Sequence, residues 1–185
     1  MLKRALFVPF GEGPPVTALD ERSPVTSCRV LLAPGEVAKA IERTALVRTG
    51  GGDILIGADL VEVSQVAEAI DRFGERYLAR VFTDHERDCC VGSAEVQAAG
   101  LAARFAAKEA TIKVLRPTDV RPDWRSIEVV RQAAGWCDIV LTSGAKDLAA
   151  DAGIEQMALS LTHEGGIAGA VVVARCRPAG EPRGR

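Results

Sequence analysis

The alanine-rich run from Leu101 to Leu115 limits the possible folds of this chain more than any other stretch. It reads Leu101-Ala-Ala-Arg-Phe-Ala-Ala-Lys-Glu-Ala-Thr-Ile-Lys-Val-Leu115. On an α-helix positions three and four apart share a face, so the large apolar residues form one stripe, made of Leu101, Phe105, Ile112 and Leu115. Pro117 requires the helix to stop before it. We therefore expect a long helix that packs on the rest of the fold.

Lys108 projects from the middle of the apolar face of this helix. Lysine is almost never fully buried without a partner. We expect an anionic group to meet Lys108, either a carboxylate from elsewhere in the chain or a ligand phosphate. Glu109 and Lys113 are four residues apart and stack at the edge of the same stripe.

The composition describes one soluble globular domain. The 185 residues are 48% hydrophobic and 26% charged with a formal net charge of −2, so bulk binding to nucleic acid or to membranes is not expected. No apolar run reaches membrane-spanning length, and Pro9 and Glu12 interrupt the start of the chain too early for a secretory signal. The five cysteines include no C-x-x-C pair, which favours reduced thiols and a cytoplasmic location.

Breaker residues divide the chain into three parts. Residues 1–52 contain Gly11-Glu-Gly-Pro-Pro15, Ser23-Pro24 and Gly50-Gly-Gly52, and we expect a partly disordered or loosely docked extension with a helix from Pro34 to about Val47. Residues 53–175 form the folded domain. Residues 176–185, rich in proline, glycine and arginine, are expected to be a flexible tail.

Within the folded domain, strand and helix patterns alternate. An apolar run at 53–63 predicts a buried strand, a helical period follows from Ser64, and Thr83-Asp-His-Glu86 predicts a capping box at the start of another helix. After the central helix, the patterns predict a hairpin of strands at 124–131 and 136–142, a helix at 145–152, and two last strands at 157–163 and 167–174. The expected fold class is α+β, with an antiparallel sheet packed against a long central helix.

Three arginines follow at four-residue spacing after residue 64, and they form a basic stripe if the helix continues past Gly74. They are Arg72, Arg76 and Arg80. Such a stripe is usually a solvated helix face. The alternative is a docking surface that attracts an acidic partner.

Charged residues at strand ends and on the central helix have a chemical interpretation. Asp59 follows the first strand, His163 ends a later one, and the helix carries the set Arg104, Lys108, Glu109 and Lys113. Magnesium takes hard oxygen ligands, usually one or two carboxylates with substrate phosphates and water, while cations hold the remaining phosphate oxygens. This arrangement suits transfer of a phosphorus group. Spacing alone does not distinguish such a site from a buried structural ion pair.

Five blocks of the sequence resemble the holo-acyl-carrier-protein synthase branch of the 4′-phosphopantetheinyl transferases. They occur in the order of that family across residues 54–174, and Phe-Ala-Ala-Lys-Glu-Ala is the most specific of them. The blocks are Ile56-Gly-Ala-Asp-Leu-Val-Glu62, Arg80-Val-Phe-Thr83, Arg104-Phe-Ala-Ala-Lys-Glu-Ala110, Trp124-Arg-Ser-Ile-Glu-Val129 and Leu159-Ser-Leu-Thr-His163.

The resemblance implies a reaction in which coenzyme A and an apo carrier protein give the holo carrier and adenosine 3′,5′-bisphosphate. By motif position, Asp59 and Glu109 would bind Mg²⁺, and Lys113 would neutralise the pyrophosphate and assist the leaving group. The family also implies a homotrimer and docking of an acidic acyl carrier protein on the basic helix that carries Arg72, Arg76 and Arg80. Contacts with coenzyme A phosphates would come from Arg104, Lys108 and His163. The base that takes the serine proton stays open between Glu109 and a metal-bound water.

Two departures from the family pattern keep a second function open. The turn after the central helix is Leu115-Arg-Pro-Thr-Asp119 in place of a glycine-containing turn, and Glu164 follows the motif histidine where a hydroxyl residue is common. Both changes fall where coenzyme A would bind. The alternative is a non-catalytic relative that binds coenzyme A or a carrier protein without transfer.

Overall fold

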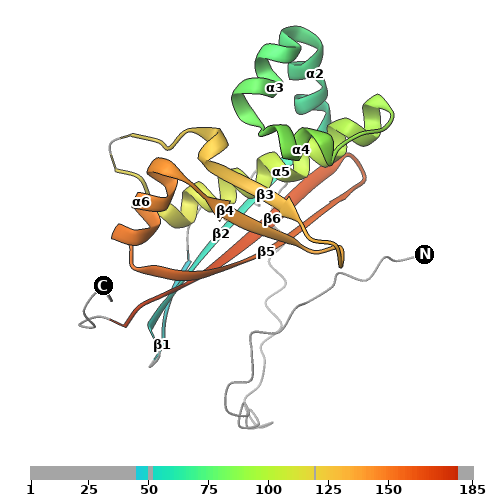
Figure 1. Cartoon of the computed structure of the whole chain (residues 1–185). Helices are drawn as coiled ribbons and strands as arrows, with labels where there is room; N and C mark the ends of the chain where they lie inside the picture. Colours follow the sequence, from blue (N-terminus) through green and yellow to red (C-terminus); the bar gives the residue numbers. More distant parts are fainter. Residues whose placement is uncertain (1–44, 50–51, 119, 179–185) are drawn as a thin grey trace, which may run out of the picture.

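The centre of the fold is helix α5, Ala94–Leu115. The computed structural model describes residues 45–49, 52–118 and 120–178. In it α5 lies across one face of a four-stranded antiparallel sheet with the strand order β1-β2-β6-β5, and a β3-β4 hairpin lies beside the helix (Figure 1). The α+β class with an antiparallel sheet packed on a long helix, predicted from the sequence, is confirmed.

The elements follow the order expected from the sequence patterns. The sheet consists of β1 (Ala45–Thr49), β2 (Gly52–Glu62), β5 (Ile154–Glu164) and β6 (Ile167–Cys176), and the hairpin of β3 (Ile127–Arg131) and β4 (Cys137–Leu141). The helices around α5 are α2 (Val63–Phe73), α3 (Glu75–Val81), α4 (Asp84–Asp88), η1 (Trp124–Ser126) and α6 (Ser143–Asp151).

Strand alternation gives the sheet two different faces. Small and branched side chains such as Ala168, Ala170 and Val172 are buried on the face that meets α5. On the opposite face Leu60, Ile167 and Val171 keep 49%, 40% and 42% of their surface exposed. No helix among the described residues covers this second face (Figure 1).

Gly57 sets how closely the helix approaches the sheet. A Cβ atom at this position would lie 2.1 Å from the carbonyl oxygen of Ala110 and 2.9 Å from a methyl of Val114. Only glycine fits where backbone meets backbone at this distance. The close approach brings the end of β2 within reach of the side chains of α5.

One local prediction was wrong. The helix expected from Pro34 to Val47 is contradicted at its end, because Ala45–Thr49 forms β1 and pairs with β2; residues 34–44 lie outside the described residues. The condition stated for the basic stripe is not met, because Gly74, with a positive φ of 54°, separates α2 from α3, and one continuous helix does not carry the three arginines. The capping box at Thr83 is confirmed, with the side chains of Thr83 and Glu86 accepting each other's backbone N–H.

The last strand continues through Cys176, one residue into the expected tail, and residues 179–185 lie outside the described part of the chain. Within the described ranges, no helix has both the length and the apolar composition to cross a membrane.

Candidate active site

Asp59 and Lys113 meet where β2 passes beneath α5. The Nζ atom of Lys113 lies 2.9 Å from Oδ1 of Asp59 and donates a second hydrogen bond of 2.9 Å to the carbonyl oxygen of Ala58. Both side chains are largely buried, at 20% and 18% exposed, so the lysine ammonium is fixed at the end of the strand. The two predicted site residues, 54 positions apart in the chain, are therefore in contact.

Glu109 lies next to this pair on α5. Burial raises the pKa of its carboxyl group and the charge of Asp59 adds to the rise, while Arg121 and Lys113 oppose it. Arg121, in the segment between α5 and η1, forms an ion pair of 3.6 Å with Oε1 of Glu109. The carboxylates of Asp59 and Glu109 thus lie in one partly buried region, where Lys113 pairs with Asp59 and Arg121 pairs with Glu109.

The donor set at this position fits a magnesium ion. Among the described residues no three His, Cys, Asp or Glu side chains are grouped as a complete metal cage. Magnesium does not need one, because it commonly binds one or two carboxylates and completes its shell with water and substrate phosphates. Asp59 and Glu109, with electrostatic coupling between them, offer two hard oxygen donors of this kind.

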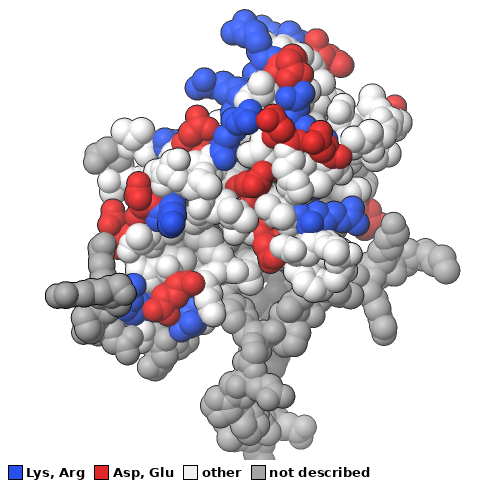
Figure 2. All heavy atoms as spheres, viewed as in Figure 1, with Lys and Arg blue, Asp and Glu red and all other residues white. Residues whose placement is uncertain are grey.

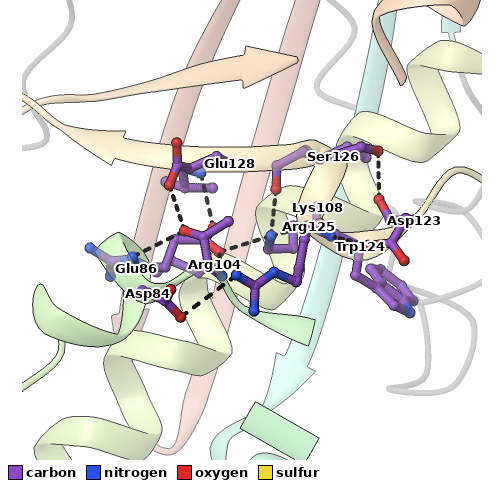
Figure 3. A network of polar contacts seen from close by, with 12 residues as sticks. Asp84, Glu86, Arg104, Lys108, Asp123, Trp124, Arg125, Ser126 and Glu128 are labelled. Atoms are coloured by element: carbon purple, nitrogen blue, oxygen red, sulfur yellow. Dashed lines mark hydrogen bonds and ion pairs between the residues drawn. The ribbon is translucent and has the colours of Figure 1, made fainter. Parts of the chain in front are cut away.

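Lys108 does not point toward these carboxylates, although it precedes Glu109. Its side chain is fully buried, and Nζ forms an ion pair of 2.9 Å with Oε2 of Glu86. The same atom donates to the carbonyl oxygens of Trp124, at 2.8 Å, and Ile127 (Figure 3). With three acceptors, the ammonium has no donor left for a ligand. The predicted contact of Lys108 with coenzyme A phosphates is corrected: its anionic partner is a carboxylate of the same chain.

Glu86 is satisfied as completely as its partner. Its carboxylate accepts from the backbone N–H of Thr83 and of Val129, both at 2.9 Å, in addition to Lys108. The hydroxyl of Thr83 donates to Oε1 of Glu128 at 2.5 Å. This network joins α4, α5 and β3 in the interior. Burial lowers the pKa of Lys108, and the Glu86 charge opposes that shift.

Arg104 lies one turn before Lys108 and is only 6% exposed. One guanidinium nitrogen donates to the carbonyl oxygen of Gly100 at 3.2 Å, while the buried Nε has no hydrogen-bond partner among the described residues. A buried guanidinium with an unsatisfied donor is costly. Arg104 shares the Lys108 side of α5, so the structure does not bring it to Asp59 and Glu109 within one chain.

His163 lies on the helix-facing side of the sheet, at the end of β5. It pairs with Ala168, which pairs in turn with Val61, so two strand spacings of about 5 Å separate it from the end of β2. Its side chain is exposed. Glu164 is the next residue of the strand and therefore points to the opposite face. The carboxylate after the motif histidine is turned away from His163.

The three arginines of the expected basic stripe are exposed on two short helices. Arg72 is in the last turn of α2 and lies over the ring of Phe73, 5.0 Å from its centroid, whereas Arg76 and Arg80 are on α3. Basic side chains gather over this end of the molecule, with acidic ones between them (Figure 2). The surface is basic, but it consists of two helices that Gly74 separates.

Two residues of the site region are not identified from the sequence. The sequence assigns Glu86 only to a capping box, because its partner Lys108 is 22 positions away and no local pattern joins them. Arg121 follows the turn that departs from the family pattern and stands beside Pro122. An isolated arginine in a loop gives no signal in a single sequence.

Comparison with known proteins identifies the family of the chain. The model of the 4′-phosphopantetheinyl transferase superfamily matches residues 55–171. A holo-[acyl-carrier-protein] synthase of Desulforudis audaxviator is 41% identical over 119 residues, which cover 64% of this chain and 90% of that protein. Another from Paramagnetospirillum magneticum is 39% identical over 129 residues, or 67% and 97%.

Solved structures give the same result. The complex of the Chronobacterium ammoniagenes enzyme with CoA has a TM-score of 0.59 and 30% identity, covering 67% of this chain and 98% of the other. The Helicobacter pylori holo-[acyl-carrier-protein] synthase in complex with coenzyme A has a TM-score of 0.56 and 26% identity, covering 64% and 98%.

The chain belongs to the 4′-phosphopantetheinyl transferase superfamily. Its relatives assign it to the holo-[acyl-carrier-protein] synthase branch, a group of transferase enzymes.

Proposed function

We propose that this enzyme transfers 4′-phosphopantetheine from coenzyme A to a serine of an acidic apo acyl carrier protein, with Mg²⁺, and releases adenosine 3′,5′-bisphosphate. The observation that carries the proposal is the convergence of Asp59, Glu109 and Lys113 at the junction of β2 and α5. Relatives named for this activity, and their complexes with coenzyme A, support the choice of substrates. The four described cysteines are free thiols, in keeping with the cytoplasm as its location.

Asp59 and Glu109 would hold the magnesium ion. When bound, the ion supplies positive charge that offsets the negative charge of the pyrophosphate. Lys113, anchored by the Ala58 carbonyl oxygen, is in place to neutralise a phosphate oxygen and to protonate the leaving group. Glu109 is one candidate for the base that accepts the serine proton.

Arg104 and His163 are proposed to bind the phosphates of coenzyme A. Arg104 faces the opposite side of α5 from Asp59, so the two side chains do not converge on one phosphate within a single protomer. The unsatisfied Nε of Arg104 favours an anion bound there. A homotrimer, typical of the family, would combine Arg104 of one protomer with the carboxylates of another. The exposed apolar face of the sheet is suited to such an assembly.

The acidic carrier protein is proposed to dock on Arg72, Arg76 and Arg80. These side chains are exposed, and α2 follows directly from the strand that carries Asp59. Opposite charge on the partner would accelerate its association.

Mass spectrometry of an apo carrier protein incubated with coenzyme A and Mg²⁺ tests the proposal. The carrier should gain the mass of phosphopantetheine, and omission of Mg²⁺ should prevent this. Glu109→Gln should abolish transfer without unfolding the protein, because the amide is a much poorer ligand for Mg²⁺ than the carboxylate.

Glu155→Gln provides a matched control. Glu155 is a partly exposed carboxylate that pairs with Arg175 far from the site, so its loss should leave the rate of transfer unchanged. Undiminished transfer by Glu109→Gln would remove Glu109 from the metal site. Tight binding of coenzyme A without any gain of carrier mass would support the alternative, a non-catalytic binder.

A further inference from the structure

The orientation of α3 relative to α5 depends on polar contacts as well as on apolar packing. α3 carries two of the arginines of the proposed docking surface, and α5 carries Glu109 and Lys113. In Figure 1, α2 and α3 project beyond the sheet, whereas α4 returns to the body of the fold. The contacts that fix α4 and α3 against α5 therefore determine where a docked partner sits.

The inner contact is the buried pair of Glu86 and Lys108. Both side chains are completely inaccessible to solvent, and their charged atoms are 2.9 Å apart. Glu86 belongs to α4 and also accepts the N–H of Val129 on β3. Lys108 belongs to α5 and donates to the carbonyl oxygens of Trp124, the first residue of η1, and Ile127, the first residue of β3 (Figure 3). A single pair thus fixes three neighbouring segments against α5.

The outer contact is Arg125 of η1. One of its nitrogens donates to the carbonyl oxygen of Ala79 on α3 at 3.0 Å, and another lies 3.6 Å from Oδ1 of Asp84 on α4. Its side chain is 40% exposed, so this residue is joined to the surface of α3 from outside the core. Asp84 and Arg125 lie beside the buried pair in Figure 3.

Stability alone does not explain a buried ion pair at this position. Apolar side chains of similar volume often give equal or greater stability than a buried pair. What the pair adds is a defined orientation of the segments that it joins, because each short hydrogen bond reaches a particular backbone atom. Orientation matters for a transfer reaction, because a misplacement of about 1 Å between reacting groups can lower the rate about 100-fold.

We propose that Glu86, Lys108 and Arg125 are positioning residues, which orient α3, and the carrier protein docked on it, relative to Asp59 and Glu109. This inference rests on the proposed function. The three residues do not touch the substrates. They act by placing the serine of the carrier within reach of the phosphorus atom.

The first test uses the double variant Glu86→Gln with Lys108→Met, which removes both charges together. The affinity for coenzyme A and the affinity for the apo carrier are each measured by calorimetry, and kcat and KM by transfer assay on the folded fraction. Both affinities should stay within about twofold of the wild type, while kcat falls by about tenfold or more. A residue that only stabilises the fold would lower the melting temperature and leave kcat unchanged.

The second test uses Arg125→Gln, which is at the surface and does not disturb the core. It should lower kcat several-fold with little change in the KM for the carrier, and Arg125→Lys, which keeps a donor for Ala79, should recover part of the loss. Arg175→Gln is the matched control, because Arg175 is also 40% exposed and also forms an ion pair, 3.2 Å from Glu155, away from α3.

Unchanged kcat in Arg125→Gln, or a loss confined to KM, overturns the positioning role, and this outcome is available even if the double variant fails to fold. The wild-type enzyme is measured in every series. If the wild-type enzyme modifies no apo carrier, the result counts against the proposed function. If the wild-type enzyme transfers normally and Arg125→Gln has an unchanged kcat, the result counts only against the positioning role of these residues.

Discussion

Lys108 and Lys113 are five residues apart on one helix, yet their surroundings give them different roles. Lys113 is 20% exposed and reaches Asp59 at the end of β2, whereas Lys108 is fully buried and pairs with Glu86. The sequence predicted an anionic partner for Lys108 but left open whether it was a carboxylate or a phosphate. The choice depends on a residue 22 positions earlier, whose direction only the tertiary structure defines.

At this scale we predict strong coupling between Lys108 and Glu86. Lys108→Met should lower the free energy of unfolding by about 3–5 kcal/mol, because it leaves the Glu86 carboxylate buried without its counterion. Adding Glu86→Gln should restore part of the loss. Urea unfolding of the two single variants and the double variant completes a double-mutant cycle, in which simple additivity would contradict the coupling.

The buried thiol of Cys90 predicts a dependence of stability on pH. Burial raises the pKa of this thiol above its ordinary value of 9.0, and nearby Arg104 opposes the shift. Its stabilising contribution is therefore complete below about pH 9 and is lost as the pH rises through the folded-state pKa, because the unfolded chain releases its proton first. Between pH 8 and pH 10, the free energy of unfolding measured with urea should fall less in Cys90→Ala than in the wild type. An equal fall in both proteins would mean that Cys90 does not contribute to the pH dependence of stability.

Among the elements, the contact between α5 and β2 decides whether the site forms. We predict that Gly57→Ala lowers the free energy of unfolding by about 1–3 kcal/mol, because the new methyl would meet the Ala110 carbonyl oxygen and a methyl of Val114. The same shift should separate Asp59 from Lys113 and lower turnover. Thermal unfolding and the transfer assay measure the two effects.

Gly144→Ala is the control for this substitution. Gly144 lies in α6, and a methyl there would meet nothing within 4 Å. Alanine is favoured over glycine within a helix by up to about 1 kcal/mol, so this variant should be at least as stable as the wild type. Similar destabilisation of both variants would show that close approach at Gly57 is not the cause.

The type and order of most elements between residues 52 and 176 could be predicted, because period, capping and turn signals are local. The 3-10 turn η1 at Trp124–Ser126 could not, because the strand pattern of residues 124–131 extends over it. The strand β1 could not, since Ala45–Thr49 takes its conformation from pairing with β2 and its own pattern suggested a helix. The break at Gly74 was left open for a related reason: one glycine within a helical period is compatible with either outcome, and here its φ is positive.

For the whole molecule, the face of the sheet that no helix of the described residues covers predicts self-association. Val171→Asp should dissociate the proposed homotrimer and lower transfer, because a charge would be placed within an apolar contact. Analytical ultracentrifugation and activity measured over a range of protein concentrations test this. Val140→Asp is a close control, since Val140 on the separate hairpin is 41% exposed and Val171 is 42% exposed. If both variants dissociate, or if neither does, this face of the sheet is not the interface of the proposed homotrimer.

The proposed assembly would also explain which parts of the site a single sequence could supply. The motif positions identified Asp59, Glu109 and Lys113, which one chain brings together. Arg104, turned to the other side of α5, has the same motif support but no common location with them. Sequence spacing gives the helical face of a residue, not the protomer whose ligand it contacts.

The interruption at Gly74 bears on the proposed docking of a carrier protein. Because α2 ends there and α3 sets out in a new direction, Arg72 and Arg80 cannot line up along one straight edge. An acidic protein whose charges follow a straight helix could satisfy one end of this surface or the other, but only a curved counterpart would satisfy both. Selection among acidic carriers would then depend on the shape of their charged surface. Added salt would lower the affinity for every carrier without changing the order of their affinities.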